Sequence, residues 1–437
     1  MTEAHTVIEA SGRDSETRNY PLTWAQATMW EYVLALGTQA RDLNLPRRRL
    51  LRTPHGIGQV LAALTRFFAE CDVARTTFDV TRRAQVIRPA VAAPIRVLDS
   101  GGDPAKAAAD LASELAGAAF SPGTDLPVRF GLVADGDEVH ALAVAYSHLV
   151  FDAFSHSLVA GFLERGLEGA AEETPHVRDL VRREATDRMR ERSEAALSQW
   201  SNALSALPPG RGFRLPSAGS YTEWALHSRE AAVAAQTVAT RHRVNTSSVL
   251  LAALGAALRP VLADPPAALL LVASNRHHPD LAGFTGIALQ IGLHVIPPAD
   301  GEGTVHAYLR ATQDSAIRGY AKARYDTTRW REKLAAMTER GTAPDLSFYF
   351  NDARRSRGWD GLEHRAGELA SWQPGDAHVT AVATHRVRDA TMFAYVLDGG
   401  PTARIHLVCD DAVIPPAQAE AVLRGLEEYL VRRALAG

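Results

Sequence analysis

A histidine and an aspartate four positions apart, His148 and Asp152, stand where an apolar run gives way to a helical pattern. The run at 139–145 is rich in Val and Ala, which is typical of a buried strand, and residues 157–164 carry apolar side chains at helical spacing. Loops between such elements often hold binding and catalytic groups, because the flanking elements position them rigidly. An imidazole has an ordinary pKa of about 6.5, so His148 has the chemistry of a general base.

Both residues also have a structural interpretation. A histidine inside a protein often does no more than donate a hydrogen bond to a backbone carbonyl. Asp152 is close enough to fold back and fix the turn through a hydrogen bond or an ion pair, and a tight turn favours this role over proton transfer.

The elements expected around His148 form a hairpin. Strands are expected at about 128–134 and 138–146, because apolar residues flank the turn sequence Asp-Gly-Asp at 135–137. Thr23 and Gln26 have the spacing of a capping box and predict a helix start, and Thr246 or Ser247 is the expected cap of another helix. Periodicity predicts further helices at 58–68, 104–119, 178–200, 249–258 and 416–432. It predicts further strands at 268–273, 391–398 and 402–409.

Residues 147–153, Ser-His-Leu-Val-Phe-Asp-Ala, resemble the His-His-x-x-x-Asp-Gly motif of the condensation domains of nonribosomal peptide synthetases. The second His and the Asp match as His148 and Asp152, whereas Ser147 and Ala153 replace the first His and the Gly. Related acyltransferases share a shorter His-x-x-x-Asp-Gly form. Other ordered segments resemble the same family, at 21–30, 71–78, 120–130, 274–286 and 346–351. The resemblance therefore extends from Pro21 to about Leu430.

The resemblance implies an α/β (α+β) fold of two chloramphenicol-acetyltransferase-like lobes in a V, with the active site in a tunnel between them. We expect an N-terminal lobe at 1–175 and a C-terminal lobe at 176–437, joined by the long charged helix at 178–200. The mixed charges of that helix indicate a solvated face.

The resemblance also implies the chemistry. The family transfers an acyl or aminoacyl group from the phosphopantetheine thioester of a carrier protein to an amine or a hydroxyl, which attacks the thioester directly. His148 is then the catalytic residue that deprotonates or positions the acceptor, and Asp152 pairs with Arg276, although two independent surface charges are the alternative. The residues expected to contact the substrate are Ser147, Ser155, Gln290 and Asn351. We expect no bound cofactor.

Three functions follow from this pattern. The first is a free-standing condensation enzyme, since the chain has the length of one condensation domain and its substrates would arrive in trans. The second is a coenzyme A-dependent O- or N-acyltransferase of the same superfamily. The third is a non-catalytic module that recruits a partner, which Ser147 and Ala153 favour, whereas His148, Asp152 and Arg276 favour an enzyme.

Composition and charge limit the kinds of partner and ligand that we expect. The 437 residues carry a formal net charge of −3, which gives no indication of a nucleic-acid or membrane partner. There are two cysteines, as expected for a reducing cytoplasm, and no run of about 18 apolar residues. The short basic run Pro46-Arg47-Arg48-Arg49 could receive an acidic carrier protein or a phosphopantetheine phosphate, but a solvated turn is the preferred interpretation. His277 and His278 lack a third spaced ligand, so no metal is expected.

Overall fold

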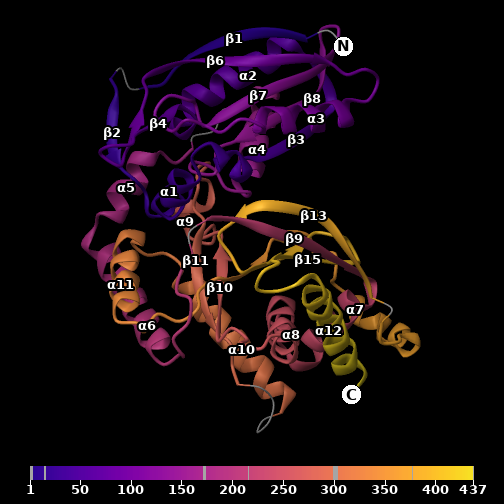
Figure 1. Cartoon of the computed structure of the whole chain (residues 1–437). Helices are drawn as coiled ribbons and strands as arrows, with labels where there is room; N and C mark the ends of the chain where they lie inside the picture. The colour runs from indigo at the N-terminus through magenta and orange to yellow at the C-terminus, as the bar shows by residue number, and fades with distance from the viewer. Residues whose placement is uncertain are drawn as a thin grey trace. The chain divides into compact units, whose positions relative to one another are not determined.

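The computed structural model describes residues 3–13, 16–170, 174–214, 216–298, 304–375 and 377–436. The chain divides into two compact units: the first contains residues 1–192 and 274–290, and the second contains residues 193–273 and 291–437. Each unit combines β-sheet with helices, so the prediction of a mixed α/β fold is confirmed (Figure 1).

The first unit is built on a five-stranded sheet in the order β1-β6-β7-β8-β3, accompanied by a small sheet in the order β2-β5-β4. Its strands are β1 Glu3–Ser11, β2 Arg18–Pro21, β3 Leu45–Gly56, β4 Thr76–Asp79, β5 Ala84–Ile87, β6 Ala90–Asp99, β7 Val128–Asp135 and β8 Glu138–Tyr146. Its helices are α1 Trp24–Leu36, η1 Gly37–Leu43, α2 Ile57–Glu70, η2 Asp72–Arg75, α3 Pro104–Ala116, α4 Ser155–Leu167, α5 Val177–Glu184 and α9 Pro279–Ala282, and α6 Asp187–Ser205 leads into the second unit.

The alternation of side chains along β7 shows how helices cover both faces of this sheet. Phe130 stacks edge-on against Phe67 of α2, whereas its neighbour Gly131 faces α3. A Cβ on Gly131 would come within 2.5 Å of the Leu111 side chain on α3, so the helix packs closely against the strand at this glycine. The expected hairpin is confirmed, because β7 and β8 pair antiparallel across the turn at Gly136, whose φ is +60°.

The second unit is built on a seven-stranded sheet in the order β11-β10-β12-β14-β15-β9-β13. Its strands are β9 Ser217–Ser228, β10 Ala268–Ala273, β11 Gln290–Val295, β12 Phe348–Asp352, β13 His378–Arg388, β14 Met392–Leu397 and β15 Ala403–Asp410. Its other helices are α7 Arg229–His242, α8 Thr246–Val261, α10 Val305–Ala321, α11 Thr327–Glu339, η3 Leu362–Ser371 and α12 Pro416–Leu435.

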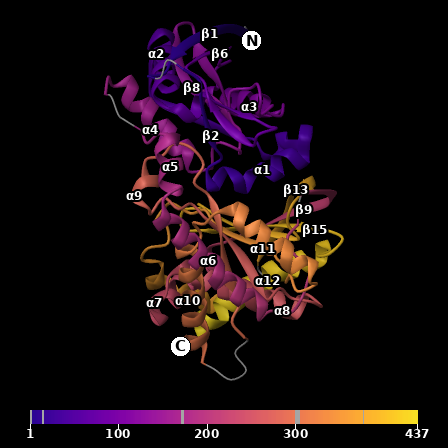
Figure 2. The ribbon, with the colours of Figure 1, turned by 90° about the vertical axis from the view of Figure 1, so that its left-hand side faces the viewer.

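Alternate residues of the central strands serve two cores in this unit. Phe348 and Phe350 of β12 join the cluster formed with α7, α8 and α12. Tyr349, between them, joins the cluster of α6 and α11, which lie side by side in Figure 2. Trp200 of α6 and Trp330 of α11 meet edge-to-face there, with ring centroids 5.0 Å apart. The period of two along the strand therefore gives the sheet one helical layer on each face.

The unit boundary differs from the expected one near residue 175. Helix α5 lies in the first unit because Val177 N–H donates to Asp72 at 2.9 Å and Trp24 N–H donates to Glu184 at 3.0 Å. Residues 274–290 also belong to the first unit, although β10 and β11 on either side of them are strands of the second.

Three local expectations need correction. The single helix at 178–200 is two helices, and Thr186 between them accepts from Met189 N–H as the start of α6. Helix α8 is capped by Asn245 rather than Thr246 or Ser247, because the Asn245 side chain accepts from Ser248 N–H. Residues 46–49 lie in the edge strand β3, paired with β8, rather than in a turn. The capping box of Thr23 and Gln26 is confirmed.

Neither cysteine forms a disulfide, since Cys71 and Cys409 are both free and buried. Within the described ranges, no single helix is long and apolar enough to cross a membrane. Among the helices described, α7 and α8 taken together reach that length and composition, and they meet at a bend of 110°.

Candidate functional site

His148 lies in a tight turn at the end of β8. The turn is set by its neighbour Ser147, whose N–H donates to Pro127 and whose carbonyl accepts from Val150 N–H at 3.1 Å and Phe151 N–H at 3.0 Å. These bonds reverse the chain within a few residues and place His148 between strand β8 and helix α4. The hairpin therefore delivers the histidine, as its pattern predicted.

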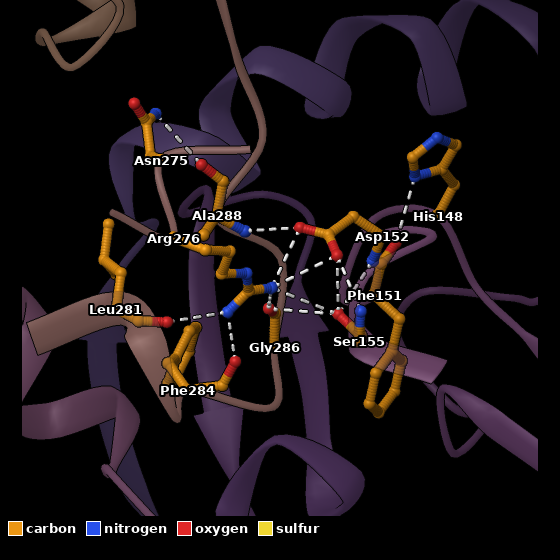
Figure 3. Close-up of polar contacts among 10 residues, drawn as sticks. All are labelled: His148, Phe151, Asp152, Ser155, Asn275, Arg276, Leu281, Phe284, Gly286 and Ala288. Carbon is orange, nitrogen blue, oxygen red and sulfur yellow. Dashed lines mark hydrogen bonds and ion pairs between the residues drawn. The ribbon is translucent and has the colours of Figure 1, made fainter. Parts of the chain in front are cut away.

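The turn also determines which nitrogen of His148 carries a proton. Nδ1 lies 3.0 Å from the carbonyl oxygen of Phe151, and because a carbonyl can only accept, Nδ1 is the donor. In the neutral ring Nε2 then holds a lone pair. Figure 3 shows the ring directed away from Asp152 and Arg276. Nε2 is therefore the atom that can take a proton from a substrate.

The surroundings of His148 favour the neutral ring. Burial lowers the pKa of the imidazole, and this effect outweighs the Asp152 carboxylate and the Phe151 carbonyl, which both act to raise it. Arg47 lowers the pKa of His148 further. A pKa below the ordinary value keeps His148 unprotonated at neutral pH, as a general base requires.

Asp152 is a structural residue of the same turn. Its N–H donates to Ser155 Oγ at 3.0 Å, and its Oδ1 accepts from Ser155 N–H at 2.8 Å and from the Ser155 hydroxyl at 2.9 Å. Its Oδ2 accepts from Ala288 N–H at 2.9 Å. The reciprocal bonds fix the start of α4, and the bond to Ala288 ties the turn to residues 274–290 (Figure 3).

Arg276 is the charged partner of Asp152. Its Nη2 lies 3.1 Å from Oδ1 and 3.0 Å from Oδ2, and the exposed fractions of the two side chains are only 5% and 3%. The guanidinium also donates to three backbone carbonyls, those of Leu281, Phe284 and Gly286. The expected pair is thus present, and these bonds offset part of the cost of burying two charges.

The pKa of Asp152 decides against a role in proton transfer. Burial acts to raise the pKa of the carboxyl, but the Arg276 guanidinium and the donors from Ala288 and Ser155 outweigh it and hold the pKa below the ordinary value. Asp152 is therefore ionised at neutral pH, and it has no proton to give.

The backbone of residues 274–290 is shaped to hold Arg276 in place. Asn275 has a φ of +55°, a left-handed conformation that asparagine tolerates better than most residues, and its Nδ2 donates to the Ala288 carbonyl at 3.1 Å. A Cβ on Gly286 would lie 2.7 Å from the Phe284 ring and 2.8 Å from Val73. Ile287 N–H donates to the carbonyl of Val150, which lies in the His148 turn.

Several residues of this site were not predicted. Asn275 and Gly286 matched the family segment but had no assigned role, and Ala288 gave no signal, because its contribution is a backbone N–H. Ala153, in place of the motif's Gly, is not among the described non-glycine residues with positive φ, so the turn accommodates it without left-handed strain.

The remaining predicted contacts are distributed over both units. Ser155 is fully buried and its hydroxyl belongs to the Asp152–Arg276 cluster. Ser147 and Gln290 are buried in the first unit, at 8% and 2% exposure, and Asn351 is partly buried on β12 of the second. Their contact with substrate stays a prediction. In the part of the chain that the structure describes, no three His, Cys, Asp or Glu side chains are arranged to hold a metal.

Several known proteins resemble this chain. A relative, surfactin synthase subunit 2 of Bacillus subtilis (strain 168), is 23% identical over 351 residues, which is 77% of this chain and 10% of that protein. The chain thus spans about a tenth of the length of this relative.

Solved structures show the same fold. SgcC5 from Streptomyces globisporus superposes with a TM-score of 0.71 at 14% identity, covering 94% of this chain and 99% of that one. The condensation domain of the monacolin K polyketide synthase MokA superposes with a TM-score of 0.72 at 15% identity, covering 96% of this chain and 98% of that one. A condensation domain responsible for chain release from the enacyloxin polyketide synthase superposes with a TM-score of 0.71 at 19% identity, covering 98% of this chain and 84% of that one.

The family itself is identified by its sequence pattern. The family model described as Condensation domain matches residues 16–354, a span that includes the His148 turn and the Arg276 loop. The chain belongs to the condensation domain family, whose members transfer acyl groups in the biosynthesis carried out by nonribosomal peptide synthetases and similar enzymes.

Proposed function

We propose that this protein transfers a carrier-protein-bound acyl or aminoacyl group to an amine or hydroxyl acceptor, forming an amide or an ester. The observation that carries the proposal is the His148 Nε2 lone pair, which the bond from Nδ1 to Phe151 leaves unprotonated in the neutral ring. The donor is presented on the phosphopantetheine arm of a carrier protein, and the enzyme acts on donor and acceptor supplied in trans.

The proposed reaction needs no nucleophile from the protein. Nε2 of His148 takes the proton of the acceptor N–H or O–H as that atom attacks the thioester carbonyl. The carbon–sulfur bond then breaks, and the departing thiolate takes the proton back from the imidazolium. The products are the amide or ester and the free thiol. Such proton transfer by a positioned base contributes typically about 10²–10⁴ in rate.

The Asp152–Arg276 cluster supports this reaction indirectly. Asp152 bonds Ser155 and Ala288, and so holds the turn in which Phe151 fixes the His148 tautomer. The complete cluster favours an active enzyme over a non-catalytic module, because the charged groups that shape the turn are all retained despite Ser147 and Ala153.

The test is intact-protein mass spectrometry of acyl-loaded carrier proteins incubated with this chain and with amine or alcohol acceptors. One similar structure, SgcC5, was solved with (R)-(-)-1-(2-naphthyl)-1,2-ethanediol, and this diol is a useful first alcohol. We expect loss of the acyl group from the carrier and a new amide or ester that needs both substrates.

Two outcomes would change the proposal. Product from acyl-coenzyme A but not from any carrier-bound donor would indicate the coenzyme A-dependent acyltransferase instead. Binding of a carrier protein without acyl transfer from any donor would indicate a recruiting module and overturn the enzymatic function.

A further inference from the structure

A second group of ionisable side chains lies in the second unit, on strands β9, β13 and β15. Glu223 of β9 stands between two histidines: its Oε2 is 2.9 Å from His385 Nε2, and its Oε1 is 2.7 Å from His406 Nδ1. Arg388 donates to the other ring nitrogen of His385, Nδ1, at 2.9 Å. All four residues lie in the second unit, and none takes part in the Asp152–Arg276 cluster.

The hydrogen-bond partners determine which atom donates in each contact of this group. Arg388 can only donate, so His385 Nδ1 is an acceptor and the ring proton is on Nε2, which donates to Glu223. Hydrogen bonds from His385 and His406 hold the pKa of Glu223 at about 2, so its carboxylate is ionised and only accepts. His406 therefore donates through Nδ1, and in its neutral form Nε2 carries a lone pair.

This lone pair is unused. His406 is 8% exposed, and its Nε2 is buried with no hydrogen-bond partner among the residues that the structure describes. A buried acceptor without a donor is unfavourable, since it has lost its hydration without a replacement. A carboxylate that fixes one imidazole nitrogen and leaves the other free is the arrangement by which proteins aim histidine at a bound group.

The alternation of side chains along β15 places His406 on the face of the sheet opposite the core formed with α7, α8 and α12. Its neighbours in sequence, Ile405 and Leu407, face the core formed with α7, α8 and α12, so His406 points to the opposite side. On that side Tyr395 is directly opposite His406 in the β14–β15 ladder, and the Tyr395 ring stacks on Phe393 at 4.2 Å between centroids. The unused acceptor thus adjoins an aromatic surface.

The charges nearby select the kind of ligand. Each oxygen of Glu223 already accepts a hydrogen bond from a histidine, so the carboxylate is less available to a cationic ligand. Arg388 adjoins His385, and Arg404 lies opposite His227 in the β15–β9 ladder, where it lowers the pKa of that histidine after the larger effect of burial. The positive charges of Arg388 and Arg404 repel an ammonium group, and the Glu223 carboxylate between the histidines already accepts hydrogen bonds. A ligand that donates a hydrogen bond without carrying a positive charge is therefore favoured.

We infer that His406, held by Glu223, binds a neutral small molecule that donates an O–H or N–H to Nε2 and lays an apolar or aromatic part toward Tyr395. The chemical class is an alcohol or an un-ionised amine. This inference does not depend on the proposed acyl transfer, and it can be tested without any acyl donor.

The site can be tested with a pair of probes that differ only in the donor. In ¹⁵N-histidine-labelled full-length protein at pH 7, 2-phenylethanol is expected to shift the His406 Nε2 resonance in a saturable titration. Its methyl ether has the same aromatic part without the O–H, and should bind roughly two- to tenfold more weakly, as expected for loss of one neutral hydrogen bond. This comparison uses the wild-type protein, so it does not depend on the folding of a variant.

Variants then assign the effect. Glu223→Gln should remove the tautomer preference of His406 and the difference between the two probes, while His378→Gln, an exposed histidine on β13, should leave both titrations unchanged. Equal response to alcohol and ether, or no response to either, would mean that Nε2 holds only water and would overturn the inference. A resonance showing a proton on Nε2 of His406 at pH 7 would overturn it as well.

Discussion

One nitrogen of Arg276, Nη2, reaches both carboxylate oxygens of Asp152, at 3.1 and 3.0 Å, inside the turn that presents His148. The other terminal nitrogen, Nη1, is occupied by the carbonyls of Leu281 and Phe284. The guanidinium therefore joins the turn to residues 274–290, which lie between two strands of the second unit in sequence but fold with the first. We propose that the charge pair positions the site rather than reacting.

Breaking this pair from either side should destabilise the protein. We expect Asp152→Asn and Arg276→Ala each to lower the free energy of unfolding by about 3–5 kcal/mol, since each leaves a buried charge unpaired. The double variant should cost much less than the sum, and urea unfolding of the four proteins gives the coupling energy.

A matched control for this cycle lies in the same unit. Arg183 and Asp280 approach to 3.5 Å, but the Arg183 side chain is 57% exposed. A cycle on this pair should give about 0–1 kcal/mol. A coupling energy for Asp152 and Arg276 no larger than that of the control would show that their contact does not stabilise the turn.

Gly286 should not tolerate a side chain. We expect Gly286→Ala to destabilise the protein by about 1–3 kcal/mol, as overpacking does, because its Cβ would meet the Phe284 ring and Val73 at less than 3 Å. The control is Gly367→Ala, where a Cβ meets nothing within 4 Å. Thermal unfolding of both variants checks the prediction, and equal melting temperatures would contradict it.

How far the sequence determined this site depends on the kind of group involved. The strands and turn that deliver His148 followed from apolar patterning, and the Asp152–Arg276 pair followed from matching the family motif. The partners that hold the pair could not be predicted, because Ala288 N–H and the carbonyls of Leu281 and Phe284 are backbone groups that every residue possesses.

The unit boundary was missed for a related reason. Pro175 precedes the charged helix expected to join the lobes, but whether α5 folds with the residues before or after it depends on tertiary hydrogen bonds, such as the one that Trp24 N–H donates to Glu184. The His385–Glu223–His406 group was also not predicted, since Glu223 is 162 and 183 residues away from the two histidines in sequence, and β9 comes to lie between β15 and β13 only in the sheet.

His294 on β11 should make stability depend on pH. Burial lowers its pKa to about 4, so the unfolded chain binds a proton more readily than the folded one between pH 6.5 and 4. The free energy of unfolding is therefore highest above pH 6.5 and falls as the pH is lowered, by about 2 kcal/mol between pH 7 and 5. His294→Gln should flatten this part of the urea-unfolding profile, and an unchanged slope would show that His294 is not responsible.

The pH dependence of acyl transfer should reflect the neutral His148 ring. A base is active when unprotonated, and burial lowers the pKa of His148, so kcat/KM should rise with pH and reach half its maximum below pH 6.5. Rates from pH 5 to 8 with one carrier-bound donor check this, with stability measured at each pH. A half-maximum well above 6.5 would mean that another group limits the rate.

The most direct measurement is the initial rate of acyl transfer by His148→Ala beside the wild type, on the same carrier-bound donor and acceptor. The variant should stay folded and transfer the acyl group about 10²–10⁴ times more slowly, because the base is lost. Its unfolding midpoint is measured beside the rate, since the hydrogen bond from Nδ1 to Phe151 is lost as well. His364→Ala, which removes an exposed histidine of the second unit, is the control and should retain the full rate. If His148→Ala transfers the acyl group at the wild-type rate, His148 is not the base.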